Sequence, residues 1–350
     1  MKGIRQQMKK TETNKNGTET DGFRQLTIWD VIQQYEHPTY SVKSLFSGCG
    51  GLDYGLQQAG LEVVESYEFE TNACATLAQA GKGAVYKCDI SKLLLDRQLR
   101  TFAISATFPC THFSSAGLRD GDDELYLEAH RLIFSLRPEV FVIENVPAMA
   151  RYKVVMEAFM KMPGYCVSKF ILNAADCGAP QNRKRLIIIG SKKPFLWNFS
   201  PLPPDERTYL IDILEGGVNE PLPKGILNRL NGVNHGQWPA RIKDPMVDDY
   251  AATCVAHYAK DQGDQLVLDP LNGRPRPYTV TEYARLQGFP DDYPFAKGKV
   301  ATLKQIGNAV SPYMARMIGN EIMRYVEMTR PDMNLYNDIH HTRVRKVILQ

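Results

Sequence analysis

Apolar and polar positions form two alternating patterns between residues 42 and 190. Short apolar runs predict strands, and stretches with apolar residues every three or four positions predict amphipathic helices. The run 140–143 is apolar throughout, as expected for a strand buried on both faces of a parallel sheet. The predicted strands are 42–46, 61–69, 84–88, 102–107, 140–143, 165–172 and 185–189, and the predicted helices are 52–59, 71–80 and 125–135. This alternation predicts an α/β fold with a parallel sheet.

The pattern changes after Gly190. Residues 191–275 are rich in Pro, Gly, Asn and Asp and predict an irregular, β-rich region, whereas helical spacing returns at 280–286 and 312–328. The predicted domains are a polar tail with a short helix at 1–40, an α/β domain at 41–190, a smaller β-rich domain at 191–302, a helix returning to the α/β domain at 303–329, and a tail at 330–350.

Composition narrows the function only slightly. The chain has 350 residues and a net charge of +3, which permits a nucleic-acid partner without demanding one. Its seven cysteines include no CxxC pair, which disfavours a disulfide framework or a structural zinc site and favours a reducing compartment. No apolar run approaches the length of a membrane span and no signal peptide is apparent, so we expect a soluble, cytoplasmic protein.

A glycine-rich turn between the first strand and the first helix predicts a cofactor site. The turn reads FSGCGGL and lacks the GxGxxG spacing typical of NAD enzymes. Glu68 ends the second strand, where a carboxylate can bind both ribose hydroxyls; Phe69 can stack on an adenine, and Asp89 can accept from its amino group. Each acid alone is more often a solvated cap, but together they predict an adenosine-containing cofactor. The candidates are Phe46, Ser47, Gly48, Gly50, Gly51, Leu52, Glu68, Phe69, Asp89 and Ile90.

Candidate catalytic residues follow the later strands. Cys110 comes after Pro109 in the segment beyond the fourth strand, at the functional edge of a parallel sheet, although a single Cys is usually a small buried hydrophobe. Glu144 ends the fifth strand, and we expect it beside the Cys110 segment. Arg183 and Arg185 then present two guanidinium groups at alternate positions of an extended segment.

Six motifs in order resemble those of the DNA cytosine-5 methyltransferase family. They are FSGCGG with Glu68, PC at 109–110, ENV at 144–146, QNRKR at 181–185, TEYARLQGFPDDY at 281–293 and QIGNAV at 305–310. The resemblance spans 42–318 with a break in the irregular region. It implies a Rossmann-like AdoMet-dependent methyltransferase sheet, with 191–302 as the target recognition domain.

The resemblance also implies a mechanism. The cofactor is S-adenosyl-L-methionine, which becomes S-adenosyl-L-homocysteine, and no metal is required. Cys110 attacks carbon 6 of a cytosine flipped out of DNA, and Glu144 hydrogen-bonds N3 and the 4-amino group. Arg185 holds O2 and orients Glu144, and Arg183 supports the Cys110 loop or a phosphate. Pro109, Asn308 and Ala309 join the cofactor residues, and a residue of 114–122 fills the gap left by the base.

The expected partner is double-stranded DNA, bound by a monomer. The candidate DNA contacts are Ser114, Gln181, Lys192, Arg229 and Arg241, with Lys193 and Lys243 as further phosphate contacts. A restriction-modification system with a cognate endonuclease and an orphan or phage modification enzyme both fit this assignment. Glu282 and Arg285 are expected to brace the fold rather than to contact substrate.

Two departures and two alternatives stay open at this point. Thr111 and His112 follow the Pro-Cys pair where the family commonly has Gln, so contacts of this loop can differ. A cytosine-5 methyltransferase acting on RNA, such as tRNA, would use the same residues, although the large recognition region favours DNA. A non-catalytic DNA-binding homologue is disfavoured because Cys110, Glu144, Arg183 and Arg185 are all present.

Overall fold

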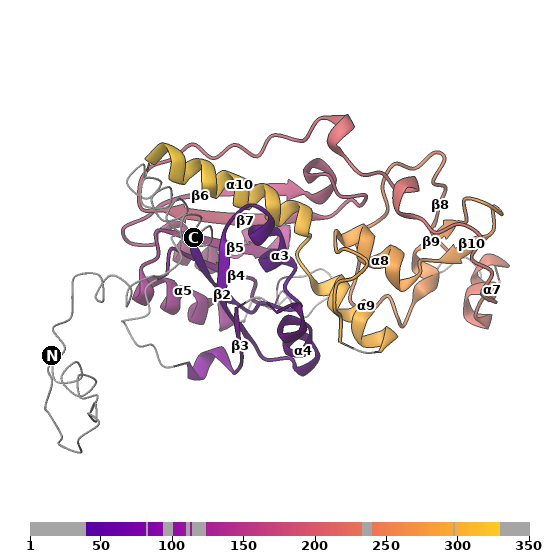
Figure 1. The fold of residues 1–350 in the computed structure, drawn as a ribbon, viewed down its shortest axis with the longest axis horizontal. Coiled ribbons are helices and arrows are strands. Elements are labelled where there is room, and N and C mark those ends of the chain that lie inside the picture. The colour runs from indigo at the N-terminus through magenta and orange to yellow at the C-terminus, as the bar shows by residue number, and fades with distance from the viewer. Residues whose placement is uncertain are drawn as a thin grey trace, which may run out of the picture. The chain divides into compact units, whose positions relative to one another are not determined.

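A seven-stranded sheet forms the centre of the molecule (Figure 1). The computed structural model describes residues 40–81, 83–93, 101–109, 113, 124–232, 240–296 and 298–329. The strands, in the spatial order β3-β2-β1-β4-β5-β7-β6, are β1 Ser41–Leu45, β2 Glu62–Glu68, β3 Ala84–Lys87, β4 Ala103–Ala106, β5 Val140–Asn145, β6 Cys166–Asn173 and β7 Lys184–Ser191. The sequence predicted all seven strands, with ends that differ by a few residues.

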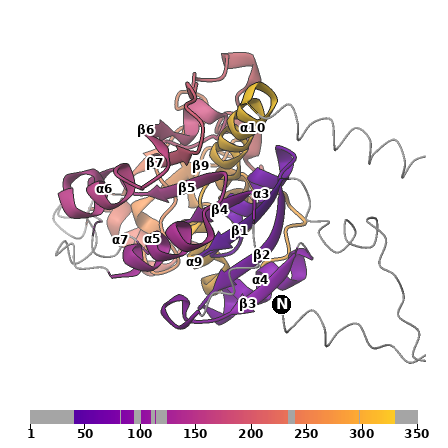
Figure 2. The same cartoon turned by 90° about the vertical axis from the view of Figure 1, so that its left-hand side faces the viewer.

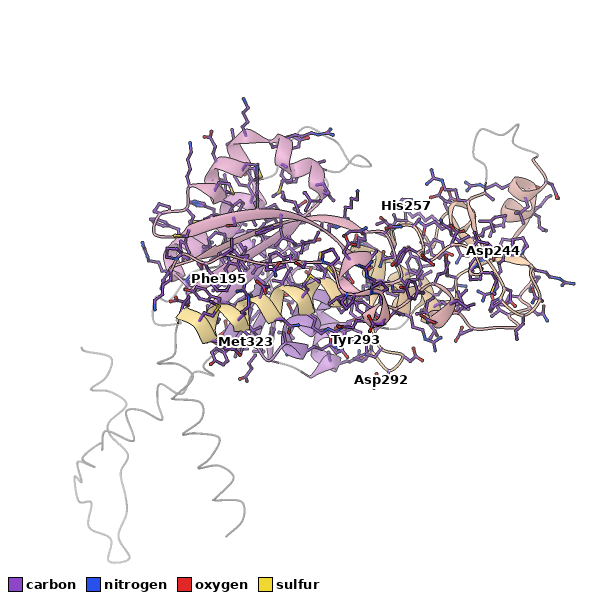
Figure 3. The ribbon with its side chains drawn as sticks, turned by 90° about the horizontal axis from the view of Figure 1, so that it is seen from above. Phe195, Asp244, His257, Asp292, Tyr293 and Met323 are labelled. Atoms are coloured by element: carbon purple, nitrogen blue, oxygen red, sulfur yellow. The ribbon has the colours of Figure 1, made fainter. Side chains whose placement is uncertain are left out.

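Helices cover both faces of this sheet (Figure 2). The helices are α3 Gly51–Gln58, α4 Thr71–Ala80, α5 Leu125–Leu136, α6 Lys153–Met160 and α10 Pro312–Thr329. Along β5, Val140 and Val142 join the core beneath α3 and α10, whereas Phe141 and Ile143 join the core beneath α5 and α6. This alternation explains why the strand is apolar throughout. Figure 3 marks Phe195 and Met323, which pack against the first of these cores.

Two helices lie unusually close together because one of them carries a glycine at the contact. A Cβ atom on Gly55 of α3 would lie 2.4 Å from the Ala315 Cβ and from the Pro312 carbonyl of α10. Only a residue without a side chain permits this approach. The last helix of the chain is thereby held against the first helix of the sheet.

The sheet is mixed, which corrects the prediction of a parallel sheet. Strands β3, β2, β1, β4 and β5 are parallel, but β7 runs antiparallel to both β5 and β6. The connection from β6 to β7, residues 174–183, contains only the short 3-10 turn Ala174–Cys177 and is too short for the crossover that a parallel neighbour needs. Because β7 is reversed, its beginning lies beside the end of β5, with Leu186 paired to Asn145.

A second, smaller sheet follows in the chain, where the sequence predicted a β-rich region. Its strands, in the order β10-β9-β8, are β8 Ile242–Lys243, β9 Leu266–Leu268 and β10 Pro275–Pro277. The helices here are α7 Lys224–Leu230, α8 Val280–Gln287 and α9 Lys299–Asn308, and short 3-10 turns occur at Ile90–Lys92, Pro147–Arg151, Ala174–Cys177, Pro204–Glu206, Ile211–Ile213 and Gln262–Asp264. Helices α6, α7 and α9 were not predicted.

Glu282 and Arg285 brace the fold, as predicted. Glu282 is fully buried, caps the start of α8 together with Thr279, and pairs with Arg276 at 2.8 Å. Arg285 pairs with Asp291 at 2.6 Å. Across the described ranges, none of the helices combines the length and the apolar character needed to cross a membrane.

Candidate active site

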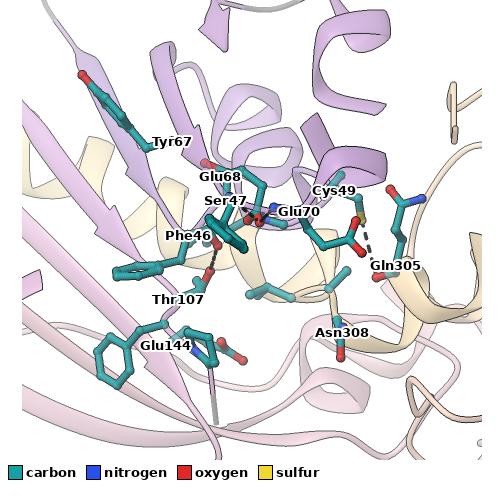
Figure 4. Close-up of a pocket in the computed structure, with 18 of the residues that line it drawn as sticks. Phe46, Ser47, Cys49, Tyr67, Glu68, Glu70, Thr107, Glu144, Gln305 and Asn308 are labelled. Atoms are coloured by element: carbon teal, nitrogen blue, oxygen red, sulfur yellow. Dashed lines mark hydrogen bonds between the residues drawn. The ribbon is translucent and has the colours of Figure 1, made fainter. Parts of the chain in front are cut away.

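A cavity of about 610 Å³ opens at the carboxyl ends of β1, β2, β4 and β5 (Figure 4). It brings together most of the predicted cofactor and catalytic residues. Those that line it are Phe46, Ser47, Gly48, Leu52, Glu68, Phe69, Asp89, Ile90, Pro109, Glu144, Arg183, Arg185, Asn308 and Ala309. Of the predicted residues that the structure describes, Gly50, Gly51, Gln181, Lys192, Arg229 and Arg241 are not among the lining residues. Cys110 and Ser114 lie outside the described residues.

The turn after β1 forms one wall of the cavity. Phe46 and Gly48 have φ values of 57° and Gly50 of 85°, in the left-handed region that favours glycine. A Cβ on Gly48 would meet no atom within 4 Å, so this glycine faces open space. By contrast, a Cβ on Gly51 would lie 2.3 Å from the Val310 carbonyl. Gly51 therefore serves close packing against the segment after α9.

Glu68 closes this turn from the end of β2. Its Oε2 accepts the Gly48 N–H at 2.8 Å, and its Oε1 accepts the N–H groups of Phe69 and Glu70 at 2.8 and 2.7 Å. A carboxylate offers about four lone-pair sites, so acceptor capacity is left for a ligand hydroxyl. The Phe69 side chain is 71% exposed, which leaves its ring free to stack.

Asp89 lies at the end of β3 and caps the turn that follows. Its Oδ1 accepts the Ser91 N–H at 3.1 Å and the Ser91 hydroxyl at 2.7 Å. The Ser91 hydroxyl in particular lowers the pKa of Asp89, so the carboxylate is ionised at neutral pH. Its second oxygen can accept a hydrogen bond from a ligand amino group.

Glu144 and Arg185 form a buried ion pair on the opposite wall. The Arg185 Nε lies 3.0 Å from Glu144 Oε1, because the reversed strand β7 places its beginning beside the end of β5. Burial raises the pKa of Glu144, and Arg185 and then Arg183 oppose this rise. The pair thus presents a carboxyl group with an elevated pKa in a water-poor site, as general acid chemistry requires.

Arg183 lines the cavity and holds backbone from two distant segments. Its side chain is buried and donates to the carbonyls of Cys254 at 2.8 Å, Gly307 at 3.2 Å and Ala309 at 2.8 Å. It therefore ties the start of β7 to the end of α9. Its Nε has no hydrogen-bond partner among the described residues. The predicted support of the Cys110 loop or of a phosphate stays a prediction, because Cys110 lies outside the described residues.

Gln181 is not placed to contact DNA, contrary to the expectation from sequence. It is fully buried, donates to the Leu286 carbonyl at 2.8 Å and to the Gln287 side chain, and accepts the Cys254 N–H at 3.0 Å. The sequence suggested a DNA contact because Gln181 belongs to the basic motif QNRKR. All its hydrogen bonds join the start of β7 to the region after β8.

The five basic residues expected on DNA, Lys192, Lys193, Arg229, Arg241 and Lys243, are not among the residues that line the cavity. The Lys192 N–H donates to Glu139 O at the beginning of β5, which is the edge of the sheet opposite Glu144. Arg229 pairs with Asp261 at 2.8 Å. Arg241 is 74% exposed and lies 3.7 Å from Asp264.

Two polar residues at strand ends were missed from the sequence. The Thr107 hydroxyl donates to the Phe46 carbonyl at 2.7 Å, and thus joins the segment before Pro109 to the glycine-rich turn. Asn145 Nδ2 donates to the Phe108 carbonyl at 3.1 Å and fixes that segment beside Glu144. Thr107 directly follows β4, and Asn145 is the last residue of β5 and part of the ENV motif, so their position at strand ends is the signal that could have revealed them.

The residues described include no cluster of three or more His, Cys, Asp or Glu side chains suited to a metal ion. The cavity fits an adenosine-containing cofactor instead. Glu68 and Asp89 offer acceptors, Phe69 offers an exposed ring, and Gly48 leaves the approach to the turn open. Its volume lies in the ordinary range of about 300–1,000 Å³ for cofactor sites.

Comparisons with known proteins agree with this geometry. The family described as C-5 cytosine-specific DNA methylase matches residues 40–324. The Type II methyltransferase M.NlaX of Neisseria lactamica is 30% identical over 308 residues, covering 81% of this chain and 96% of that protein. M.NgoPII of Neisseria gonorrhoeae, also a Type II methyltransferase, is 30% identical over 85% of this chain and 100% of its own length. The fold matches the methyltransferase EhMeth of Entamoeba histolytica with a TM-score of 0.67 at 16% identity, covering 83% of this chain and 99% of that one.

Proposed function

Because the chain belongs to the C-5 cytosine-specific DNA methylase family and is a DNA cytosine-5 methyltransferase, we propose that it methylates a cytosine flipped out of duplex DNA with S-adenosyl-L-methionine. The observation that carries this proposal is the single cavity. Its walls hold the glycine-rich turn with Glu68 on one side and Glu144 with Arg185 on the other, and Pro109 lies between. A methyl donor and a target base can therefore meet in one enclosed space.

The cofactor would lie along the wall formed by β1, β2 and β3. In this proposal Glu68 accepts from the ribose hydroxyls, Phe69 stacks on the adenine, and Asp89 accepts from the adenine amino group. Asn308 and Ala309, at the end of α9, close the site around the amino-acid portion. When bound, the cofactor supplies an electrophilic methyl group on sulfonium. Homocysteine-containing product leaves from the same wall.

The base would lie against Glu144 and Arg185. Cys110, directly after Pro109, adds as thiolate to carbon 6 of the cytosine, and the electron pair moves onto the ring. The raised pKa of Glu144 favours a carboxylic acid that donates to N3 and stabilises that charge. Arg185 holds Glu144 in place and donates to O2. Carbon 5 then takes up the methyl group, and loss of its proton and of the thiolate restores the aromatic ring.

Four of the other cysteines are poor alternatives for the nucleophile. Burial raises the pKa of Cys49, Cys177 and Cys254 to about 12, so these thiols stay protonated at neutral pH. Cys49 and Cys88 line the cavity, but Cys88 also has a raised pKa, caused first by burial. Cys110 keeps the position after Pro109 that the motif predicts.

Recognition and biological setting follow from the same family. We propose that 191–302 selects the DNA sequence and that 114–122 fills the space left by the flipped base, at a cost of a few kcal/mol for unstacking. The named relatives are Type II methyltransferases, which supports a restriction-modification or related DNA-modification role in the cytoplasm, with a cognate endonuclease as candidate partner. We propose a monomer as the active species.

One experiment separates this proposal from an RNA substrate. Purified protein is incubated with tritiated methyl donor and either duplex DNA or tRNA, and then with duplex DNA that carries 5-fluorocytosine. We expect label in DNA alone, and a denaturant-stable adduct that Cys110→Ser abolishes and that the exposed control Cys166→Ser retains. Label in tRNA alone would overturn the DNA assignment, and an adduct that persists in Cys110→Ser would exclude Cys110 as nucleophile.

A further inference from the structure

A buried carboxyl group lies on the far side of the glycine-rich turn from the cavity. Asp53, in the first turn of α3, is only 5% exposed. Its Oδ1 accepts the Ser44 hydroxyl at 2.5 Å, and its Oδ2 accepts the Ser66 hydroxyl at 2.9 Å. These serines belong to β1 and β2, so one side chain joins both strands to the start of α3.

A chain of hydroxyl groups connects this carboxyl group to the cavity. The Ser47 hydroxyl donates to the Ser44 carbonyl and hydroxyl, both at 3.0 Å. Ser47 lines the cavity and directly precedes Gly48, whose N–H is held by Glu68 (Figure 4). The turn is therefore fixed by Glu68 on one side and, through Ser44, by Asp53 beneath it.

The charge of Asp53 has few compensating groups. Among the described residues, no Lys, Arg or His lies within ion-pair distance of Asp53. The groups that stabilise its negative charge are the hydroxyls of Ser44 and Ser66 and the amino end of α3. The titratable groups that face it are Glu68, Cys49 and Tyr293, while Asp292 and Tyr54 share with it the wall of a smaller cavity. Burial, opposed by Ser44 and Ser66, raises the pKa of Asp53 to about 6.

We propose that Asp53 is a positioning residue for the cofactor, whose ionised carboxylate holds Ser44 and through it the Ser47 turn, so that protonation of Asp53 weakens cofactor binding. The inference rests on the proposed function, because it needs this cavity to bind the cofactor. The ionised form accepts both serine hydroxyls, which leaves the Ser44 oxygen free to accept from Ser47. A protonated Asp53 must donate its own hydrogen. When it donates to Ser44, the Ser44 hydroxyl loses Asp53 as its acceptor and is no longer held in the orientation that accepts from Ser47.

The affinity for the cofactor should fall at low pH. Ionised Asp53 supports binding, so affinity is full above the pKa and falls as pH drops through it. By linkage, binding of the cofactor near pH 6 releases a fraction of a proton. A hydrogen bond to a charged acceptor is stronger than one to a neutral acceptor. Full protonation of Asp53 should therefore lower the affinity for the cofactor by roughly five-fold.

Calorimetric titration of the full chain with S-adenosyl-L-homocysteine tests this between pH 5.5 and 7.5. For the wild type we expect affinity to fall by about 2.5-fold toward pH 5.5, because Asp53 is only partly protonated there. Heats in buffers of different ionisation enthalpy should show proton release near pH 6. Asp53→Asn, which mimics the protonated group, should bind weakly at every pH and release no proton. Its KM for the methyl donor should rise while kcat at saturating donor stays the same.

Control variants keep the test decisive. Ser44→Ala removes the hydroxyl that joins Asp53 to Ser47, while it leaves the Ser66 contact and the bond from Ser47 to the Ser44 carbonyl. It should weaken binding even if Asp53→Asn does not fold. The exposed Asp176→Asn should keep the wild-type profile. A wild type that binds no S-adenosyl-L-homocysteine at pH 7.5 would contradict the proposed cofactor. Wild-type binding with a flat pH profile, or an Asp53→Asn profile like that of the wild type, would overturn the role of Asp53.

Discussion

Removal of Arg185 should expose how much the catalytic ion pair depends on it. The side chains of Arg185 and Glu144 are 14% and 9% exposed, and their atoms lie 3.0 Å apart. Arg185→Met keeps most of the side-chain volume but leaves Glu144 as a buried charge with less compensation. Loss of one partner of a buried pair costs about 3–5 kcal/mol, and we expect about 3 kcal/mol because Arg183 still acts on Glu144.

The loss should depend on pH in one direction. Burial already raises the pKa of Glu144, and loss of Arg185, the main group that opposes this rise, raises it further. A carboxyl group whose pKa is higher in the folded than in the unfolded state destabilises the fold as pH rises through that range. The variant should therefore lose about 3 kcal/mol of unfolding free energy at pH 8 and a smaller amount at pH 5.5.

Urea denaturation of four proteins at both pH values provides the measurement. The double variant with Glu144→Gln removes the buried charge, so at pH 8 it should be more stable than Arg185→Met by about 2 kcal/mol. Arg241→Met, the same change at a 74% exposed site, should cost less than about 1 kcal/mol. A pH-independent loss, or a double variant no more stable than Arg185→Met, would refute the assignment of this pair as the source of the effect.

Three further results are expected. Glu144→Gln should bind S-adenosyl-L-homocysteine like the wild type in calorimetry yet lose at least about 100-fold in turnover, and unchanged turnover would remove Glu144 from the mechanism. Cys110→Ser should retain cofactor affinity while losing methyl transfer to duplex DNA, measured with tritiated donor; residual transfer above about 1% of wild type would argue for another nucleophile. Gly51→Ala places a Cβ 2.3 Å from the Val310 carbonyl and should lower the unfolding free energy by about 2 kcal/mol or more, whereas Gly225→Ala in α7, which meets no atom within 4 Å, should not.

Sequence pattern predicted the strands of the main sheet because their environment is uniform. A strand such as β5 is buried on both faces and is therefore apolar, so a polar residue at its end is easily recognised in the sequence. Glu68, Asp89 and Glu144 were identified in this way, and all three line the cavity. Local pattern also gave the limits of α4 and the bracing role of Glu282.

The sequence pattern did not predict contacts between distant segments. The apolar run of β7 is compatible with either strand direction, and the direction is set by the short connection from β6. Gln181 and Arg183 carry polar groups typical of a surface, yet both are buried by residues more than 70 positions away. A polar side chain can be satisfied by solvent, by DNA or by backbone carbonyls, and sequence alone does not distinguish these outcomes.

The same short segment contacts both walls of the cavity, which in the proposed mechanism would link cofactor binding to base recognition. Arg185 pairs with Glu144 on one wall, while Arg183, two residues earlier, donates to the Ala309 carbonyl on the other. Gln287 donates to that carbonyl as well and also contacts Gln181. The wall formed by α9 is therefore held by the segment that positions the catalytic carboxyl group. Because these ties join the start of β7 to the last third of the chain, the cavity is complete only when both parts have folded together.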